Sequence, residues 1–175
     1  MKSALLVIDV QKEFIIDIFN RQKIICQIKK LIDFFKKRKW LVIFIQDFHS
    51  SKKDKEFEKW GCHALKGTKG VEYIDELKPG KKNLVIKKKR YSAFFDTKLN
   101  KILRKNKIFK IFLVGIYTDF CVLATALDAY MRDYDVFVIA DATGTKSLAR
   151  HRQILKQIKI LAAKKNRFDK TSFKW

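Results

Sequence analysis

The hydrophobic positions of this chain follow two patterns that alternate along its length. Short continuous runs of apolar residues are typical of strands that are buried on both faces of a parallel sheet. Longer segments between them have apolar residues at three- and four-residue steps, as amphipathic helices do. The runs predict strands at Ala4–Ile8, Trp40–Ile45, Leu84–Ile86, Ile111–Val114 and Val136–Ala140.

The clearest helical segment has apolar residues on one face and Lys and Arg on the other. Similar periodicity predicts helices over Asp96–Lys107, Asp119–Arg132 and Lys146–Ala163. Strands and helices that alternate with right-handed crossovers build a doubly wound α/β sheet. We therefore expect residues 1–175 to form a single three-layer α/β/α domain with a mostly parallel sheet. The apolar face of the clearest helix consists of Ile24, Ile25, Ile28, Leu31, Ile32 and Phe35.

The segment Asp47–Lys82 interrupts this alternation, because it is long, polar and poorly periodic. A loop of that length within a compact domain usually has a function, so we expect it to contribute to a site. His151 and the tail Phe168–Trp175 are predicted to be structural, and the tail could add a final edge strand.

The composition indicates a folded protein with a very basic surface. Hydrophobic residues make up 47% of the 175 residues, which excludes a disordered chain. The 40 Lys and Arg against 18 Asp and Glu give a formal net charge of +22, which makes nucleic-acid binding a rival function. We find no helix-turn-helix signature, RNP aromatics or zinc-finger spacing, and therefore expect no specific nucleic-acid partner. Dispersed lysines at predicted solvent-facing positions include Lys29, Lys30, Lys36, Lys37, Lys101, Lys105 and Lys107.

Cysteine usage and hydropathy bear on the cellular compartment. Cys26, Cys62 and Cys121 are an odd number without paired spacing, which is typical of a reduced cytosolic protein. The first apolar run reaches Asp9 too soon for a signal peptide. No stretch approaches the roughly 18 apolar residues of a membrane span. We expect a cytoplasmic protein without membrane contact, and a homo-oligomer is compatible with these features.

Chemically active side chains follow four of the predicted strands. Asp9 follows the first strand, Asp47 and His49 the second, Lys87–Lys89 the third, and Cys121 the fourth. Ligands of an open parallel sheet bind beyond the carboxyl ends of its strands. We therefore expect a carboxylate, a metal-binding pair, an amine and a thiol to converge at one edge.

Cys121 lies just inside the predicted start of a helix, where free N–H groups and positive potential favour a thiolate. A cationic lysine nearby would lower the thiol pKa further. Asp9 could take the thiol proton and return it to a leaving group, and backbone N–H groups of the turn could bind an oxyanion. Taken singly, Cys121 also fits a buried small hydrophobic residue, Asp9 a helix N-cap, and the lysine a solvated surface charge. Only their joint placement favours catalysis.

The long loop carries donor groups typical of a divalent-metal site. Asp47 and His49 are two residues apart, so on an extended segment they point to the same side, and Glu56 and His63 follow. Carboxylate and imidazole ligands suit Zn²⁺, Mn²⁺ or Fe²⁺. The Asp-x-His pair alone is a weak signal whose simpler interpretation is a polar loop. Cys62 fits a half-buried loop thiol better than a ligand.

Taken together, these residues resemble the isochorismatase-like cysteine hydrolase superfamily, and within it the nicotinamidases. The resemblance covers Leu5 to Ala142, with the motifs in the right order. The motifs are Ile8-Asp9-Val10-Gln11 with Phe14, Asp47-Phe48-His49, Glu56 to Trp60 to His63 with Gly67-Thr68 and Gly70, Lys88-Lys89-Arg90-Tyr91-Ser92-Ala93-Phe94 with Thr97, Gly115-Ile116-Tyr117-Thr118-Asp119-Phe120-Cys121-Val122 with Thr125-Ala126, and Asp141-Ala142.

The resemblance implies the isochorismatase-like hydrolase fold and a catalytic triad of Asp9, Lys88 and Cys121. The family places its lysine three residues before the Tyr-Ser-Ala-Phe unit, which selects Lys88 from the adjacent lysines. The resemblance also implies a cis peptide bond between Ile116 and Tyr117. The backbone N–H groups of Tyr117 and Cys121 would then form the oxyanion hole.

The resemblance further implies one divalent metal ion, zinc first, with manganese or iron as alternatives. Glu56 would be the third ligand, with Glu58 as the fallback. Phe14, Trp60 and Tyr91 would bind the substrate by enclosing a pyridine ring. The full ligand set would be Asp47, His49, Glu56 and His63.

The expected activity is hydrolysis of nicotinamide to nicotinate and ammonia through a cysteine thioester, in NAD salvage. The chain departs from the family pattern at Gln46, at Trp60–Cys62 and at Phe95–Thr97. These departures keep open a second hypothesis, an amidohydrolase of the same family that acts on another small amide or ureido compound.

Overall fold

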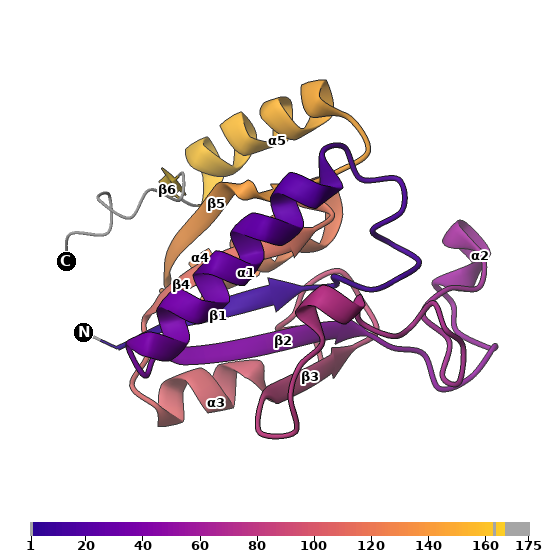
Figure 1. Cartoon of the computed structure of the whole chain (residues 1–175), viewed down its shortest axis with the longest axis horizontal. Helices are drawn as coiled ribbons and strands as arrows, with labels where there is room; N and C mark the ends of the chain where they lie inside the picture. Colours follow the sequence, from indigo (N-terminus) through magenta and orange to yellow (C-terminus); the bar gives the residue numbers. More distant parts are fainter. Residues whose placement is uncertain (1, 163, 167–175) are drawn as a thin grey trace.

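A parallel β-sheet forms the centre of the molecule (Figure 1). The computed structural model describes residues 2–162 and 164–166. In the described residues the sheet has six strands in the order β3-β2-β1-β4-β5-β6, and every pair is parallel. The strands are β1 (Ser3–Ile8), β2 (Leu41–Asp47), β3 (Leu84–Lys88), β4 (Lys110–Ile116), β5 (Asp135–Gly144) and β6 (Lys164–Asn166).

Helices cover both faces of the sheet, which makes the three layers that the sequence predicts. Helix α1 (Arg21–Lys37) and the short 3-10 helix η1 (Asp75–Leu77) pack on one face. The opposite face carries α3 (Leu99–Lys105), α4 (Leu123–Tyr130) and α5 (Leu148–Leu161). No helix in the described part of the chain is long and apolar enough to cross a membrane.

The predicted strands lie at the observed strands, and the apolar runs of β1, β2, β4 and β5 are buried on both faces, whereas the edge strand β3 leaves Val85 exposed. All six residues of β1 are buried, and the odd and even positions belong to different hydrophobic cores. All six apolar residues that define the α1 face are buried as well. The last strand, β6, lies before Phe168–Trp175, the tail in which an edge strand was considered, and that tail lies outside the described residues.

The predicted helix over Asp119–Arg132 has a different start. Residues Thr118–Val122 form a single π-helical turn, η2, and regular helix α4 begins only at Leu123. Single π turns of this kind occur frequently at functional sites. Cys121 lies within this turn rather than in the first turn of an ordinary α-helix.

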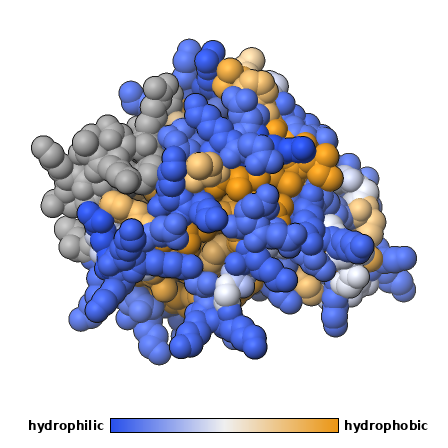
Figure 2. Space-filling model, viewed as in Figure 1, coloured by the Kyte–Doolittle hydropathy of each residue, from blue (hydrophilic) through white to orange (hydrophobic). Residues whose placement is uncertain are grey.

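The basic residues coat the outside of these layers. The lysines expected to face solvent on α1 and in and after α3 are exposed. Figure 2 shows hydrophilic side chains spread over much of the face that carries α1, with apolar areas between them. This dispersed coat has the form expected of a solvated surface with weak attraction for polyanions.

The centre of the sheet is unusually close-packed at Gly115, which pairs with Ile8 across β1 and β4. Gly115 has a φ of +115°, and a β-carbon there would lie 2.0 Å from the carbonyl oxygen of Ile8. Only glycine accommodates both the backbone angle and the approach. This contact fixes β4 against β1 one residue before Asp9.

We therefore expect Gly115→Ala to lower the free energy of unfolding by about 2–4 kcal/mol, because it adds both a clash and an unfavourable φ. Urea denaturation followed by circular dichroism measures the change. Gly80→Ala is the control, because its β-carbon would meet only the Asn83 side chain, at 3.3 Å. An unchanged denaturation midpoint in Gly115→Ala would contradict this account.

Candidate active site

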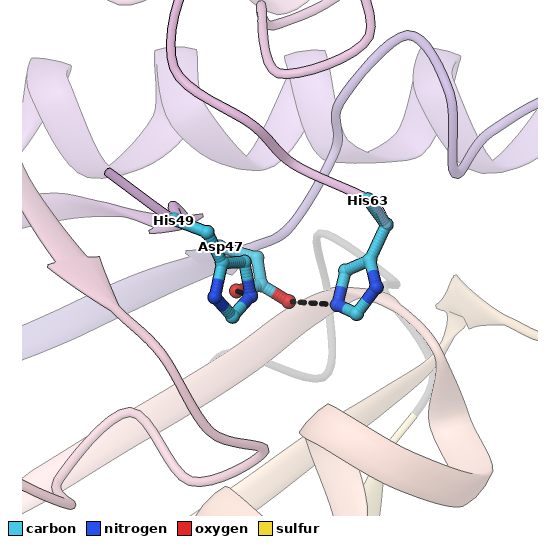
Figure 3. A group of neighbouring side chains, drawn as sticks. All are labelled: Asp47, His49 and His63. Carbon is cyan, nitrogen blue, oxygen red and sulfur yellow. Dashed lines mark ion pairs between the residues drawn. The ribbon is translucent and has the colours of Figure 1, made fainter. Parts of the chain in front are cut away.

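Three of the predicted metal-binding side chains lie together at the carboxyl ends of the strands (Figure 3). Asp47 ends β2, His49 follows it, and His63 comes from the long loop. The Nε2 atom of His49 lies 3.3 Å from Asp47 Oδ1, and that of His63 lies 3.8 Å from Asp47 Oδ2. One ligand atom from each residue lies within 4.8 Å of the other two. This compact set of nitrogen and oxygen donors matches the chemistry of a zinc site.

Glu56 lines the same cavity but lies outside this compact group. Its side chain is 7% exposed, and its Oε2 atom lies 3.5 Å from Arg90 Nη1. Burial and the charge of Asp47 raise the pKa of Glu56. Burial also opposes ionisation of Asp47, but His49 and Lys88 outweigh it and lower the pKa of Asp47. Two buried carboxyl groups thus face one small space, where a cation would relieve their repulsion.

The buried donor atoms fit a divalent metal ion. Asp47 Oδ1, His49 Nε2 and Glu56 Oε2 are all buried, and none has a hydrogen-bond partner in the described part of the chain. Their charged contacts are long: His49 Nε2 lies 3.3 Å from Asp47 Oδ1, and Glu56 Oε2 lies 3.5 Å from Arg90 Nη1. Buried polar atoms normally make hydrogen bonds, and zinc binds oxygen and nitrogen atoms of this kind. A metal ion bound by these residues would give these atoms a close partner.

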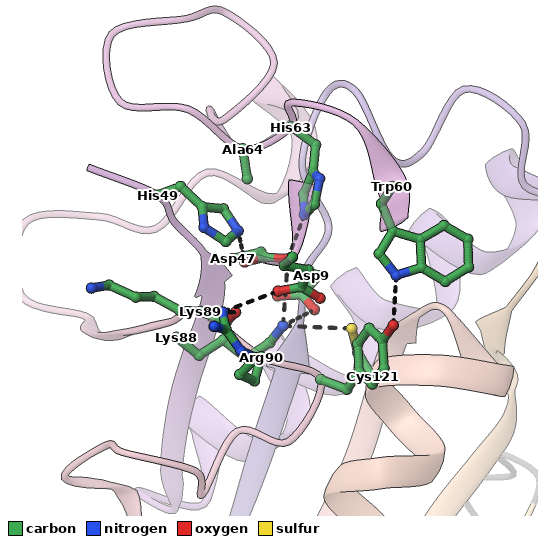
Figure 4. A network of polar contacts seen from close by, with 12 residues as sticks. Asp9, Asp47, His49, Trp60, His63, Ala64, Lys88, Lys89, Arg90 and Cys121 are labelled. Carbon is green, nitrogen blue, oxygen red and sulfur yellow. Dashed lines mark hydrogen bonds and ion pairs between the residues drawn. The ribbon is translucent and has the colours of Figure 1, made fainter. Parts of the chain in front are cut away.

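The predicted triad lies next to the metal-binding group (Figure 4). The Nζ atom of Lys88 lies 2.8 Å from Asp9 Oδ2 and 3.8 Å from Asp47 Oδ2, and it donates a hydrogen bond to Cys121 Sγ at 3.5 Å. Lys88 is buried at the end of β3, whereas Lys87 and Lys89 are exposed. Of the three adjacent lysines, the structure brings only Lys88 to Asp9 and Cys121.

Burial controls the ionisation of this group. Desolvation raises the pKa of Asp9 to about 6, because it and the nearby charge of Asp47 outweigh the attraction of Lys88. Burial opposes the charge of Lys88, but Asp9, Cys121 and Asp47 more than compensate, so its pKa lies above its ordinary value. Lys88 therefore stays charged at neutral pH, and the Asp9 carboxyl group holds its proton to a higher pH than an ordinary aspartate does.

The thiol behaves differently from the sequence-based expectation. Burial raises the pKa of Cys121 well above its ordinary value, and the opposing effect of Lys88 is smaller. The position near a helix start therefore does not produce a resting thiolate. The Cys121 proton has to be removed by a base, and Asp9 interacts directly with the thiol.

The turn that carries Cys121 has the geometry that the resemblance implies. The peptide bond between Ile116 and Tyr117 is cis, and η2 starts at the next residue. The hydroxyl of Thr118 lies 2.9 Å from Nδ1 of His151, whose Nε2 lies 3.0 Å from the carbonyl oxygen of Ala140. His151, expected to be structural, thus ties α5 to the start of this turn.

Several site residues carry no role in the sequence interpretation. Gln11 belongs to the family motif that contains Asp9. Its buried amide donates a hydrogen bond to the Asp47 carbonyl oxygen at 3.0 Å and accepts one from the Asp47 N–H at 2.8 Å. Glu13 accepts a hydrogen bond from the N–H of Ala64, next to His63. Asp54 contacts His49. Gln11 could have been found from its position in the sequence, as a polar residue two positions after Asp9 in the same motif. No periodic pattern marks Asp54.

The cavity beside the triad has a volume of about 590 Å³. Its aromatic walls include Phe14, Trp60 and Tyr91, the three expected substrate-binding residues. The indole N–H of Trp60 donates to Tyr91 Oη at 2.6 Å, which joins the long loop to the segment after β3. A further wall, which the sequence did not predict, consists of Asp119, Phe120, Thr145, Lys146, Ser147 and Arg150.

Comparison with known proteins gives this arrangement a context. The isochorismatase domain model matches residues 3–166. The chain belongs to the isochorismatase family. A probable inactive nicotinamidase of Arabidopsis thaliana is 29% identical over 178 residues, which cover 93% of this chain and 90% of that protein.

Two solved structures of the isochorismatase family are especially informative. N-carbamoylsarcosine amidase from Thermoplasma acidophilum has a TM-score of 0.84 at 33% identity and covers 95% of this chain and 96% of its own. Pyrazinamidase of Pyrococcus horikoshii, in complex with zinc, has a TM-score of 0.86 at 28% identity and covers 96% of this chain and 100% of its own. Family members hydrolyse amide or related C–N bonds, and this chain is such a hydrolase.

The ionisation of Cys121 can be measured without a substrate. In chelator-treated protein, we measure the rate at which iodoacetamide alkylates Cys121 as a function of pH. The rate for an unstructured cysteine peptide reaches its plateau above a pKa of about 8.5, and the rate for Cys121 should still be rising with pH there. Mass spectrometry resolves Cys121 from the exposed Cys26 and Cys62. A midpoint below that of the peptide would show that Lys88, rather than burial, controls the thiol.

Proposed function

We propose that this hydrolase is a metal-containing nicotinamidase that converts nicotinamide to nicotinate and ammonia in NAD salvage. The observation that carries the proposal is one aromatic-walled cavity lined by Cys121 and Asp9 together with Asp47 and His63. Many amidohydrolases need only the nucleophile and its base. A second set of donors suits a substrate with a ring nitrogen that a metal ion can hold. The zinc-bound pyrazinamidase structure supports this assignment.

The cofactor would be one divalent ion, with zinc preferred on ligand chemistry. Asp47, His49 and His63 would hold it, with Glu56 as the fourth donor. When bound, it would supply a Lewis acid for a substrate nitrogen. Phe14, Trp60 and Tyr91 would enclose the ring and direct its carboxamide toward Cys121.

The covalent steps use the chain's own residues. Asp9 takes the Cys121 proton, and the sulfur attacks the carboxamide carbon to form a tetrahedral adduct. The N–H groups of Tyr117 and Cys121 donate hydrogen bonds to the oxyanion. The C–N bond then breaks, and Asp9 returns the proton to the departing nitrogen, which leaves as ammonia. Asp9 then takes a proton from water, whose oxygen attacks the thioester carbon. The C–S bond breaks, Asp9 passes this proton to the Cys121 sulfur, and nicotinic acid leaves and ionises to nicotinate.

Lys88 would stabilise the charged forms of Asp9 and Cys121 during these steps. Its ammonium stays charged, and its Nζ atom lies 2.8 Å from Asp9 Oδ2 and 3.5 Å from Cys121 Sγ. It therefore stabilises the thiolate as the thiolate forms. The attraction partly offsets the cost of desolvating a buried thiolate. Lys88 therefore lowers the barrier to proton transfer without exchanging a proton itself.

Ammonia release from nicotinamide tests the proposal directly. Cys121→Ala should lower kcat/KM by about 10³-fold or more, because it removes the nucleophile. Cys26→Ala is the matched control, since Cys26 is exposed on α1. Turnover that survives in Cys121→Ala would refute the covalent mechanism.

The metal requirement has its own test. Dialysis against a chelator, or His49→Ala, should abolish nicotinamide hydrolysis, and zinc should restore the dialysed wild type but not the variant. Elemental analysis of the purified protein reports the ion and its stoichiometry. Full activity without bound metal would remove the metal from the mechanism.

The pH dependence follows from Asp9. Because its pKa is raised to about 6, kcat/KM should rise with pH through that value as the general base loses its proton. Initial rates with subsaturating nicotinamide at constant ionic strength measure the profile. A profile without an acid limb between about pH 5 and 7 would show that Asp9 is not the titrating base.

A second substrate class is favoured by one specific observation. The wall from the β5–α5 connection and α5 places Lys146 and Arg150 on the cavity. Arg150 pairs with Asp119 at 3.3 Å and Lys146 with Asp17 at 3.4 Å, and the carboxylate of a ureido or N-carbamoyl substrate would compete with these groups for the two cations. The N-carbamoylsarcosine amidase structure gives a precedent in the family. Turnover of N-carbamoyl amino acids in the presence of chelator, with nicotinamide inert, would select this alternative.

A further inference from the structure

We propose that Asp54 is a positioning residue for the metal centre, which fixes the ring of His49 so that its Nε2 atom faces the ion. This inference rests on the metal site of the proposed function but not on its substrate. None of the family motifs in the sequence includes Asp54.

The contact is specific in direction. Asp54 Oδ2 lies 3.0 Å from His49 Nδ1, while His49 Nε2, on the other side of the ring, points to Asp47 at 3.3 Å. A carboxylate at Nδ1 requires a proton on that nitrogen, because an ionised carboxylate only accepts hydrogen bonds. Nε2 is then the ring nitrogen that would bind a metal, in exchange for its 3.3 Å contact with Asp47 Oδ1. An imidazole whose far nitrogen donates to a carboxylate is both oriented and a stronger ligand.

His63 shows the same device with a different partner. Its Nδ1 lies 2.8 Å from the carbonyl oxygen of Gly61, so this nitrogen also carries the proton. The Nε2 atoms of both histidines therefore face Asp47. A backbone carbonyl cannot be removed by substitution, whereas Asp54 can, so His49 offers the experimental access.

Asp54 is itself held in place. Its Oδ1 atom accepts from Arg90 Nη1 at 2.9 Å and from the Glu56 N–H at 3.0 Å, which leaves Oδ2 for His49. Arg90 ties this part of the loop to the segment directly after Lys88.

The experiment measures zinc affinity of metal-free protein by competition with a chromogenic chelator. Asp54→Ala should raise the zinc dissociation constant about 10- to 100-fold, the usual effect of losing such a partner. Asp54→Asn should show a smaller loss, because its amide oxygen can still accept from Nδ1. Glu76→Gln is the matched control, since Glu76 is an exposed carboxylate in the same loop. Circular dichroism of the metal-free variants confirms that they fold.

A second readout isolates the ring orientation from any general loosening of the loop. Long-range ¹H–¹⁵N NMR assigns the tautomer of His49, which is one of only three histidines in the chain. Zinc-loaded wild-type protein should show the His49 proton on Nδ1, where Asp54 accepts it, and Asp54→Ala should reduce the population of this form, with Asp54→Asn restoring it.

Unchanged zinc affinity in Asp54→Ala, an equal loss in Glu76→Gln, or an unaltered His49 tautomer would each overturn the proposal. Failure of the wild type to bind zinc or manganese would overturn it as well. A protein that binds zinc through Asp54 but does not hydrolyse nicotinamide would refute the proposed substrate and leave this inference intact.

Discussion

The buried ammonium of Lys88 is the interaction on which the rest of the site depends. A cation without solvent is costly unless anionic partners surround it, and removing those partners is costlier still. Lys88 meets Asp9, Asp47 and Cys121, which come from the ends of β1 and β2 and from the turn after β4. Satisfying this one charge therefore requires the four neighbouring segments to converge. The requirement that stabilises Lys88 also brings together the proposed nucleophile, its proposed base and the first proposed metal ligand.

The strands, the outer helices and the order of the chemical groups could be predicted from the sequence, because each depends on a local signal. Continuous apolar runs identify β1 to β5, and the carboxyl-edge rule for parallel sheets correctly brings Asp9, Asp47 and Cys121 together. No local signal in the sequence distinguishes Lys88 from the two lysines beside it. Its burial is set by the register of β3 against β2, where it pairs with Asp47, and only the family resemblance identified it beforehand.

The parts that the sequence could not supply depend on long-range contacts. The pKa of Cys121 is governed by burial, which a helix-start argument does not contain. Gln11 and Asp54 act through hydrogen bonds whose geometry comes from the folded loop. The cavity wall at Lys146 and Arg150 comes from the β5–α5 connection and from α5, which follow the last family motif in the chain. The π turn at Thr118–Val122 has no marker in the periodicity of the following helix.

The division of labour between the sheet and the long loop has an evolutionary consequence. Asp9 and Cys121 follow β1 and β4, which approach closely at Ile8 and Gly115, where any side chain in place of Gly115 would clash. Trp60 and His63, by contrast, come from an insertion whose short helix α2 (Phe57–Trp60) buries none of its residues. Mutations in that insertion can reshape the substrate wall and the ligand set while the bond-breaking groups stay in place. Substitutions in this peripheral segment would therefore change which amide the cavity accepts without moving the groups proposed to break its bond.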